Sequence, residues 1–456
     1  LGKKAKVHAK LYEFQKAADT YKLALKHLQN QIKNTENPDK KMIIRSILIQ
    51  GSIADCIKDG SGNNLEALSL YKQCIEVLEK IVDERDDKLG VLRNNLADLY
   101  LRMNDPKQAL PLYELALEAL KLAGDTALVA NILSSCGSCH FHLNDYTSAR
   151  NLYGQAVSLK HDMFGEDHVS LVKVMKNLAM LDLKENKPNE AIIVLNKILD
   201  RIHDIPHNQK IPVLSTLGTA YNITKNYSEA YDAYEEVIRL IRYLDKNTTT
   251  GNTNPNNNRG KIDSLKSRKI TNNDYTAIMS DKSWVNYLSP LKQITKLALL
   301  LKRYDDVNRY SSLALDILNK FTQIFDDDKP TNINILNEND IKEYVYHFSN
   351  LAGKYYKNKK KDEQAIEYLE QAKNMYSSLE KHDPLMLGAL LVELAYLYTF
   401  NDERGEAIIR FQDALMIYKE KLGNNHAKTK EVIEALQSFM NQETESDEES
   451  GEYESH

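Results

Sequence analysis

The chain of 456 residues contains few glycines, prolines and cysteines, and it has no long apolar run. With only 17 glycines and 10 prolines, and with abundant Leu, Ala, Lys and Glu, the composition favours an all-helical fold. Four cysteines are too few for a disulfide framework, so a reducing compartment is favoured. No apolar run approaches the ~18–20 residues of a transmembrane helix, and we expect no membrane span in this chain.

Charge is concentrated at one end of the sequence. The formal net charge is −5, but residues 441–456 hold seven acidic residues and no Lys or Arg, so the remainder is close to neutral. A near-neutral body lacks the broad basic surface of a nucleic-acid-binding protein, and we expect no nucleic-acid partner. The acids that follow Ser446 make it a candidate phosphorylation site.

Three stretches of the chain share one internal pattern. In each, a small residue is followed by an aromatic three positions later, then by a polar turn, an alanine, a second aromatic and a small or branched residue. Spacings of three and four place these side chains on one face of each of two helices, and the small residues allow the helix backbones to approach closely. The stretches are NLADLYLRMNDPKQALPLYELAL from Asn95, GTAYNITKNYSEAYDAYEEVI from Gly218 and LAYLYTFNDERGEAIIRFQDAL from Leu394.

This pattern resembles the tetratricopeptide repeat, a helical hairpin that stacks into a right-handed superhelix. Weaker copies are centred on Ala17, Ala67, Ala149, Ala191, Val307 and Ala365. The resemblance implies an all-α solenoid of about nine helical hairpins covering most of the chain.

The distance between equivalent alanines indicates a subtype. Successive steps from Ala67 to Ala230 are 42, 40, 42 and 39 residues, whereas the usual repeat has about 34. With GEDH at residues 165–168 and NLA at 177–179, this spacing resembles kinesin-light-chain repeats, which implies cargo or cytoskeletal adaptation. No heptad coiled coil precedes the repeats in this sequence, so motor binding is unsupported. A mitochondrial respiratory-complex assembly factor has similar repeats, which leaves an organellar role open.

The repeats fall into two blocks. We expect an N-terminal block over residues 1–244 with about six hairpins, and a C-terminal block over 284–440 with about three hairpins and a capping helix. Residues 245–283 are rich in Asn and Thr and are predicted to be a flexible insert. A helix is expected to resume around Trp284, and the Ser-Pro pair at 289–290 is interpreted as its N-cap and first-turn proline. Residues 441–456 are predicted to be a disordered acidic tail.

The segment that begins at Ser134 contains a possible haem or metal motif. Cys136, Cys139 and His140 spell C-x-x-C-H, the pattern of covalent haem attachment. In the repeat pattern, however, Gly137 takes the small position and His140 the aromatic position of a packed helix, so the thiols are expected to be core side chains. A metal or redox protein centred on Cys136 and Cys139 is an alternative of another class. No motif for phosphate binding, a nucleophilic serine or a zinc protease is present, so we expect neither catalysis nor a cofactor.

The resemblance also implies a partner-binding groove formed by the first helix of each hairpin. Asn and Ser side chains in such a groove can hydrogen-bond an extended peptide, and Lys attracts acidic groups. No three consecutive hairpins supply the Lys, Asn and Arg set with which chaperone-binding members clamp a C-terminal carboxylate. The groove residues, carried over by position, are Asn94, Asp98, Arg102, Asn131, Ser138, Lys173, Lys176, Lys184, Ser215 and Asn222.

Three asparagines and one lysine-rich run are expected to have structural roles. Asn95, Asn177 and Asn350 recur in similar contexts and are expected to cap or bridge neighbouring helices. The lysine-rich run at residues 354–361 is expected to be the exposed turn of the eighth hairpin, with contact to an acidic partner, such as the chain's own tail, or to nucleic acid as the alternative.

These observations together predict a non-catalytic scaffold or adaptor that binds a partner peptide or helix in the concave groove. A cytoplasmic location is expected. The alternative is an organellar, mitochondrial assembly or quality-control factor, which requires a targeting segment ahead of Leu1.

Overall fold

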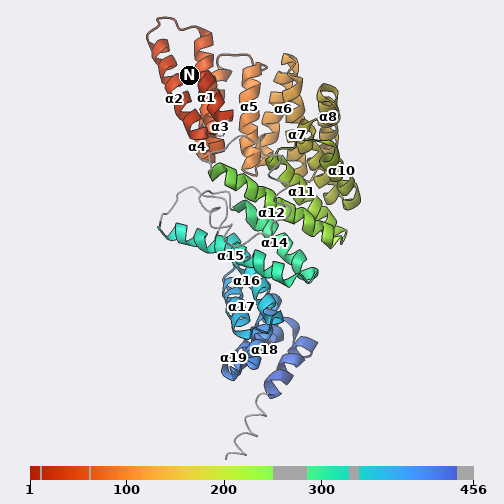
Figure 1. Ribbon diagram of the computed structural model, residues 1–456. Coiled ribbons are helices and arrows are strands. Elements are labelled where there is room, and N and C mark those ends of the chain that lie inside the picture. Colours follow the sequence, from red (N-terminus) through yellow and green to blue (C-terminus); the bar gives the residue numbers. More distant parts are fainter. Residues whose placement is uncertain (11–12, 61–62, 250–284, 328–337, 439–456) are drawn as a thin grey trace, which may run out of the picture. The chain divides into compact units, whose positions relative to one another are not determined.

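The computed structural model (Figure 1) describes residues 1–10, 13–60, 63–249, 285–327 and 338–438. In these ranges every regular element is a helix, which confirms the predicted all-α class. The chain divides into two compact units, Leu1–Lys225 and Asn226–His456, and each is described by itself. The described helices include none that is long and apolar enough to cross a membrane.

Unit 1 is a succession of helical hairpins in which each helix packs on the next along the chain. The first helices of neighbouring hairpins also contact one another, from α3 through α5, α7 and α9 to α11. The helices are α1 (Gly2–Lys10), α2 (Phe14–Lys33), α3 (Lys40–Gly60), α4 (Asn64–Glu79), α5 (Asp87–Arg102), α6 (Pro106–Ala123), α7 (Thr126–His142), α8 (Tyr146–Phe164), the 3-10 helix η1 (Val169–Leu171), α9 (Val172–Lys184), α10 (Pro188–Arg201) and α11 (His207–Ile223).

Unit 2 repeats the same plan. Helices α14 and α15 pack together, as do α16 and α17 and then α18 and α19, and the first helices α14 and α16 touch. The helices are α12 (Tyr227–Thr249), α14 (Val285–Leu300), α15 (Tyr304–Asp327), α16 (Glu338–Asn358), α17 (Asp362–Ser377), α18 (Pro384–Phe400), α19 (Arg404–Leu422) and a last helix at 427–438.

One buried position recurs on the second helix of the hairpins. Each residue there is completely buried between the two helices of its hairpin. A bulkier side chain at this position would hold the two helices apart. The repeat pattern in the sequence identifies all of these positions correctly. They are Ala17, Ala67, Ala109, Ala149, Ala191, Ala230, Val307, Ala365 and Ala407, each 0% exposed.

The turns inside the hairpins share one backbone conformation. Asn104, Asn144 and Asn186 have φ near +61° in unit 1, in the left-handed region that Asn tolerates better than most residues. After two of them an aspartate caps the second helix: Asp105 accepts from the backbone N–H of Gln108, and Asp145 does the same at the next hairpin. The polar turns of the sequence pattern are therefore helix stop and start signals.

Four features of the structure can be compared with the boundaries expected from the sequence. The compact units divide at residue 225, between the helices of the sixth predicted hairpin, and α12 continues past residue 244 to Thr249. The helix expected to resume near residue 284 is present as α14, which begins at Val285, but the N-cap and first-turn role expected for 289–290 is wrong, because Pro290 lies inside the helix. The predicted capping helix is present at 427–438, where Val432 packs in a core with Phe411. Most of the predicted insert, all of the predicted tail and Ser446 lie outside the described residues.

Candidate protein-binding site

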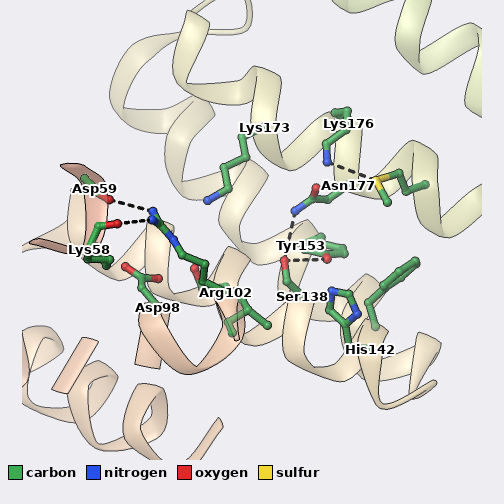
Figure 2. A pocket seen from close by; sticks show the side chains of 14 residues that line it. Lys58, Asp59, Asp98, Arg102, Ser138, His142, Tyr153, Lys173, Lys176 and Asn177 are labelled. Carbon is green, nitrogen blue, oxygen red and sulfur yellow. Dashed lines mark hydrogen bonds and ion pairs between the residues drawn. The ribbon is translucent and has the colours of Figure 1, made fainter. Parts of the chain in front are cut away.

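The described part of unit 1 contains an open pocket of about 520 Å³ that four first helices line together. Helix α3 contributes Lys58 and Asp59, and α5 contributes Asp98 and Arg102. Helices α7 and α9 form the facing wall (Figure 2), with a single residue, Tyr153, coming from the second helix α8. The pocket thus lies on the first-helix surface, where the sequence places the groove.

The structure brings half of the predicted groove residues together. The other half lie elsewhere in unit 1. The pocket includes Asp98, Arg102, Ser138, Lys173 and Lys176, while Asn94, Asn131, Lys184, Ser215 and Asn222 do not line it.

Two of the outlying residues are engaged within the protein. Asn94 is buried, and its amide donates to Asn95 Oδ1 at 3.1 Å. Asn131 Oδ1 accepts a 2.8 Å hydrogen bond from Lys160 Nζ. The buried amide of Asn94 thus has an internal partner, and the exposed Asn131 holds Lys160. Lys184 is exposed at the end of α9.

The side chains of Arg102 and Asp98, on the wall formed by α3 and α5, have partners within the protein. Arg102 donates to Asp59 Oδ1 at 2.8 Å and to the backbone oxygen of Lys58 at 3.0 Å. Asp98 accepts a 2.6 Å hydrogen bond from the hydroxyl of Tyr113 on α6. The guanidinium of Arg102 therefore links α5 to α3 and is already bonded to a carboxylate in the free protein.

The wall formed by α9 has cations without acidic partners. Lys173 and Lys176 are three residues apart on α9, and no carboxylate among the described residues forms an ion pair with either. Lys176 Nζ lies 3.2 Å from the sulfur of Met180 (Figure 2), a weak acceptor. Burial, reinforced by the charge of Lys173, lowers the pKa of Lys176 to about 8. The pocket therefore holds an excess of positive charge at neutral pH.

A short polar network forms the floor between these walls. The Tyr153 hydroxyl donates to Ser138 Oγ at 3.1 Å, and the Asn177 amide donates to the same oxygen at 3.3 Å (Figure 2). Asn95 makes the equivalent link two hairpins earlier, donating from α5 to Asp55 on α3. The expected bridging role of Asn95 and Asn177 is confirmed, and Ser138 is part of this bridge.

The cysteine motif of α7 belongs to the core. Cys136 is 3% exposed and Cys139 is fully buried, which confirms the packing interpretation. Burial raises the pKa of both thiols to about 12, so each is protonated and unreactive at neutral pH. His140 is hydrogen-bonded to Asp145 at 3.0 Å. Among the described residues, no group of three or more His, Cys, Asp and Glu side chains is arranged to hold a metal ion.

Some pocket residues were missed by the sequence analysis. Lys58 and Asp59 on α3 take the same places in the repeat pattern as Leu101 and Arg102 on α5, counted from the buried small residues Ala54 and Ala97. Extending the groove positions back to the second hairpin would have found them. Phe141, one wall of the pocket, would have been found the same way, because it lies four residues after Gly137.

The chain contains tetratricopeptide repeats. Family models described as "Tetratricopeptide repeat" match residues 47–122, 128–202 and 346–378. Proteins of this class are generally protein-interaction scaffolds.

Curated relatives match only part of the chain. The human "Tetratricopeptide repeat protein 19, mitochondrial" is 22% identical over 177 residues, which is 35% of this chain and 47% of that protein. The rat protein of the same name gives 22% over 173 residues, or 34% and 47%. The chain thus spans about half the length of the curated relatives it matches.

Solved structures resemble the fold. A Pyrococcus horikoshii signal transduction ATPase with a tetratricopeptide repeat sensor is 13% identical, with a TM-score of 0.53 over 92% of this chain and 55% of that chain. The apo quorum sensor NprR from B. thuringiensis is 14% identical, with a TM-score of 0.49 over 90% and 98% of the two chains. Identities this low bear on the fold alone.

Proposed function

We propose that the protein is a non-catalytic adaptor that binds an extended segment of a partner protein in the pocket of unit 1. The observation that carries the proposal is the pair of lysines on α9, which face an open pocket without carboxylate partners. Uncompensated ammonium groups on a rigid helix favour an acidic group in whatever binds beside them.

Two features of the pocket suit a polypeptide ligand. Polar groups at the floor, such as Asn177 and His142, can bond to a peptide backbone, while Leu101, Phe141 and Met180 offer apolar surface for its side chains. The helices that contribute these residues are packed hairpins, so the pocket exists before the partner arrives.

Affinity capture with purified full-length chain tests this function. Wild type is compared with Lys173→Glu/Lys176→Glu, in which the wall of α9 is negative. The control is Lys184→Glu/Lys187→Glu, which makes the same charge change on exposed residues outside the pocket. We expect the pocket variant to lose partners that the control retains. An unchanged set of partners in the pocket variant would refute the proposed site.

A second candidate concerns where the adaptor works. The matched relatives are named as mitochondrial proteins, and on that similarity we propose as the alternative that the chain serves as an assembly or quality-control factor in mitochondria. Fractionation of cells that express the full natural protein tests this alternative against the cytoplasmic location. Recovery in the cytosol only would remove the mitochondrial alternative.

A further inference from the structure

A second concentration of lysines lies on the first helices of unit 2. Lys292 and Lys296 are one turn apart on α14, and Lys354 is on the neighbouring α16. All three are close enough to the imidazole of His347, on α16, to lower its pKa by their charge. These three lysines and His347 define what we call the basic face of unit 2.

The repeat pattern shows why these lysines point away from the core. In unit 1, the residue that follows the buried small position accepts a hydrogen bond from a tyrosine of the second helix. The Tyr113 hydroxyl donates to Asp98, and the Tyr153 hydroxyl donates to Ser138. Lys296 and Lys354 occupy the same place, eleven residues before Val307 and Ala365, just as Asp98 and Ser138 lie eleven residues before Ala109 and Ala149.

The second helices α15 and α17 of unit 2 have no tyrosine at the position that makes this hydrogen bond. Where unit 1 has tyrosine, four residues after the buried alanine, unit 2 has Ser311 and Leu369, and both are buried. Neither side chain reaches out to the first helix with a hydroxyl as tyrosine does. Lys296 and Lys354 are therefore left without an internal acceptor, on the helix surface that forms the pocket in unit 1.

The charge of the basic face is mostly unbalanced. Lys292 pairs with Glu343 at 2.6 Å and lies over the Tyr344 ring. Lys296 and Lys354 form no ion pair with any carboxylate of the described residues. Burial and the nearby lysines lower the pKa of His347 to about 3, so the imidazole is neutral and adds no charge. Three ammonium groups thus face one carboxylate, and the atom Nε2 of His347 is buried without a hydrogen-bond partner in this part of the structure.

We propose that the basic face of unit 2 is a second binding surface, which takes a carboxylate-rich segment of a partner protein. Charge complementarity specifies the partner: an acidic chain supplies the acceptors that Lys296 and Lys354 lack. Like charges held this close are unfavourable in the free protein, and a bound carboxylate relieves their repulsion. The surface is independent of the pocket in unit 1, so either site can fail without the other.

Fluorescence anisotropy with a labelled acidic peptide tests the surface. The probe has the sequence of residues 441–456, which contains seven acids and no Lys or Arg, and a second probe has Gln or Asn in place of every acid. We expect the full-length chain to bind the acidic probe and not the neutral one. The variant Lys296→Glu/Lys354→Glu should bind at least roughly tenfold more weakly.

A matched control separates a specific surface from general charge attraction. Lys302→Glu/Lys360→Glu makes the same charge change in unit 2, at the left-handed turn positions of two hairpins, and should bind like wild type. Equal losses in the two double variants would overturn the proposal. Binding that survives Lys296→Glu/Lys354→Glu would overturn it as well, whereas loss on Lys173→Glu/Lys176→Glu alone would assign the probe to unit 1 and not to this face.

The chain's own acidic end is the competing occupant. A further variant carries Gln or Asn at the seven acids of residues 441–456. If this variant alone binds the probe, the chain's own end occupies the face and the assignment to a partner is overturned. If neither this variant nor wild type binds, the face does not take acidic peptides.

Discussion

The hydroxyl of Tyr113 on α6 donates a 2.6 Å hydrogen bond to Asp98 Oδ1 on α5, and this bond joins the core of a hairpin to the wall of the pocket. The next hairpin has the same relationship between Tyr153 and Ser138, at 3.1 Å. One end of each tyrosine is packed in the core, and the other fixes a polar residue at the pocket.

Tyr113→Phe should therefore destabilise unit 1 more than Tyr153→Phe. The first change removes a hydrogen bond to a carboxylate and should cost about 1.5–3 kcal/mol, whereas the second removes a bond between two hydroxyls and should cost about 0.5–1.5 kcal/mol. Urea unfolding followed by circular dichroism measures both. A larger loss in Tyr153→Phe would contradict the assigned role of Asp98 as the anchored acceptor.

Gly137 of α7 is expected to tolerate no side chain. A Cβ at this position would lie 2.8 Å from two ring carbons of Tyr153, so Gly137→Ala should destabilise the protein by about 1–3 kcal/mol. Gly154 on α8 is the matched control, because a Cβ there meets nothing within 4 Å. Gly154→Ala should instead stabilise the helix by about 0.5–1 kcal/mol. Two variants with the same melting temperature would show that close packing at Gly137 is not required.

The thiols of Cys136 and Cys139 should not react with thiol reagents in the native protein. Because burial raises their pKa to about 12, we expect no reaction with an aromatic disulfide reagent at pH 8 until denaturant is added. Cys56 and Cys74, also buried with raised pKa values, should behave alike. Metal analysis is the companion measurement. A stoichiometric metal that is lost in Cys139→Ser would contradict the core assignment.

The charge of the pocket should fall as the pH rises through about 8. The pKa of Lys176 is lowered by burial first and by Lys173 second, so its ammonium loses a proton well before an ordinary lysine does. Binding of an acidic segment in the pocket should weaken between pH 7 and 9, and Lys176→Met should remove that pH dependence. Competitive acetylation read by mass spectrometry reports the group directly, with exposed Lys184 as the reference.

The same acetylation experiment separates the two causes of the shift. In Lys173→Met, removal of the neighbouring charge should raise the pKa of Lys176 part of the way towards its ordinary value, because burial remains. An acetylation profile of Lys176 that matches Lys184 in wild type would show that Lys176 is solvated and that the pocket wall is not as described.

The fold was predictable because it depends on residues of fixed size at fixed spacing. Ala109, Tyr113 and Ala116 recur as a set because two helices can approach only where small side chains meet, and this constraint is visible in the letters. The positions of individual residues at helix boundaries were less predictable from the sequence. The start of α14 at Val285 agrees with the start expected near residue 284, but Pro290, expected in the first turn, lies further inside, where its missing N–H removes one hydrogen bond of the helix.

The site was only partly predictable, because solvent-facing positions can be occupied by many residue types. Position in the repeat alone identified Lys173 and Lys176 as pocket residues. It could not show that the guanidinium of Arg102 is paired with Asp59, a residue 43 positions away in the sequence. Likewise Asn94 matched a groove position and is buried against Asn95. Pairing between side chains on different helices depends on tertiary geometry, which repeat spacing does not encode.

Site-specific photo-crosslinking tests directly whether a partner binds in the pocket of unit 1. His142 is exposed and lines the pocket (Figure 2), and Ile193 is 67% exposed on the second helix α10, outside it. Benzoylphenylalanine is placed at one position or the other in the full-length chain, which is then irradiated in the presence of its captured partners. We expect crosslinks to a partner from position 142 that are absent in the Lys173→Glu/Lys176→Glu background, and none from position 193. Crosslinks from position 193 with none from position 142 would contradict this expectation.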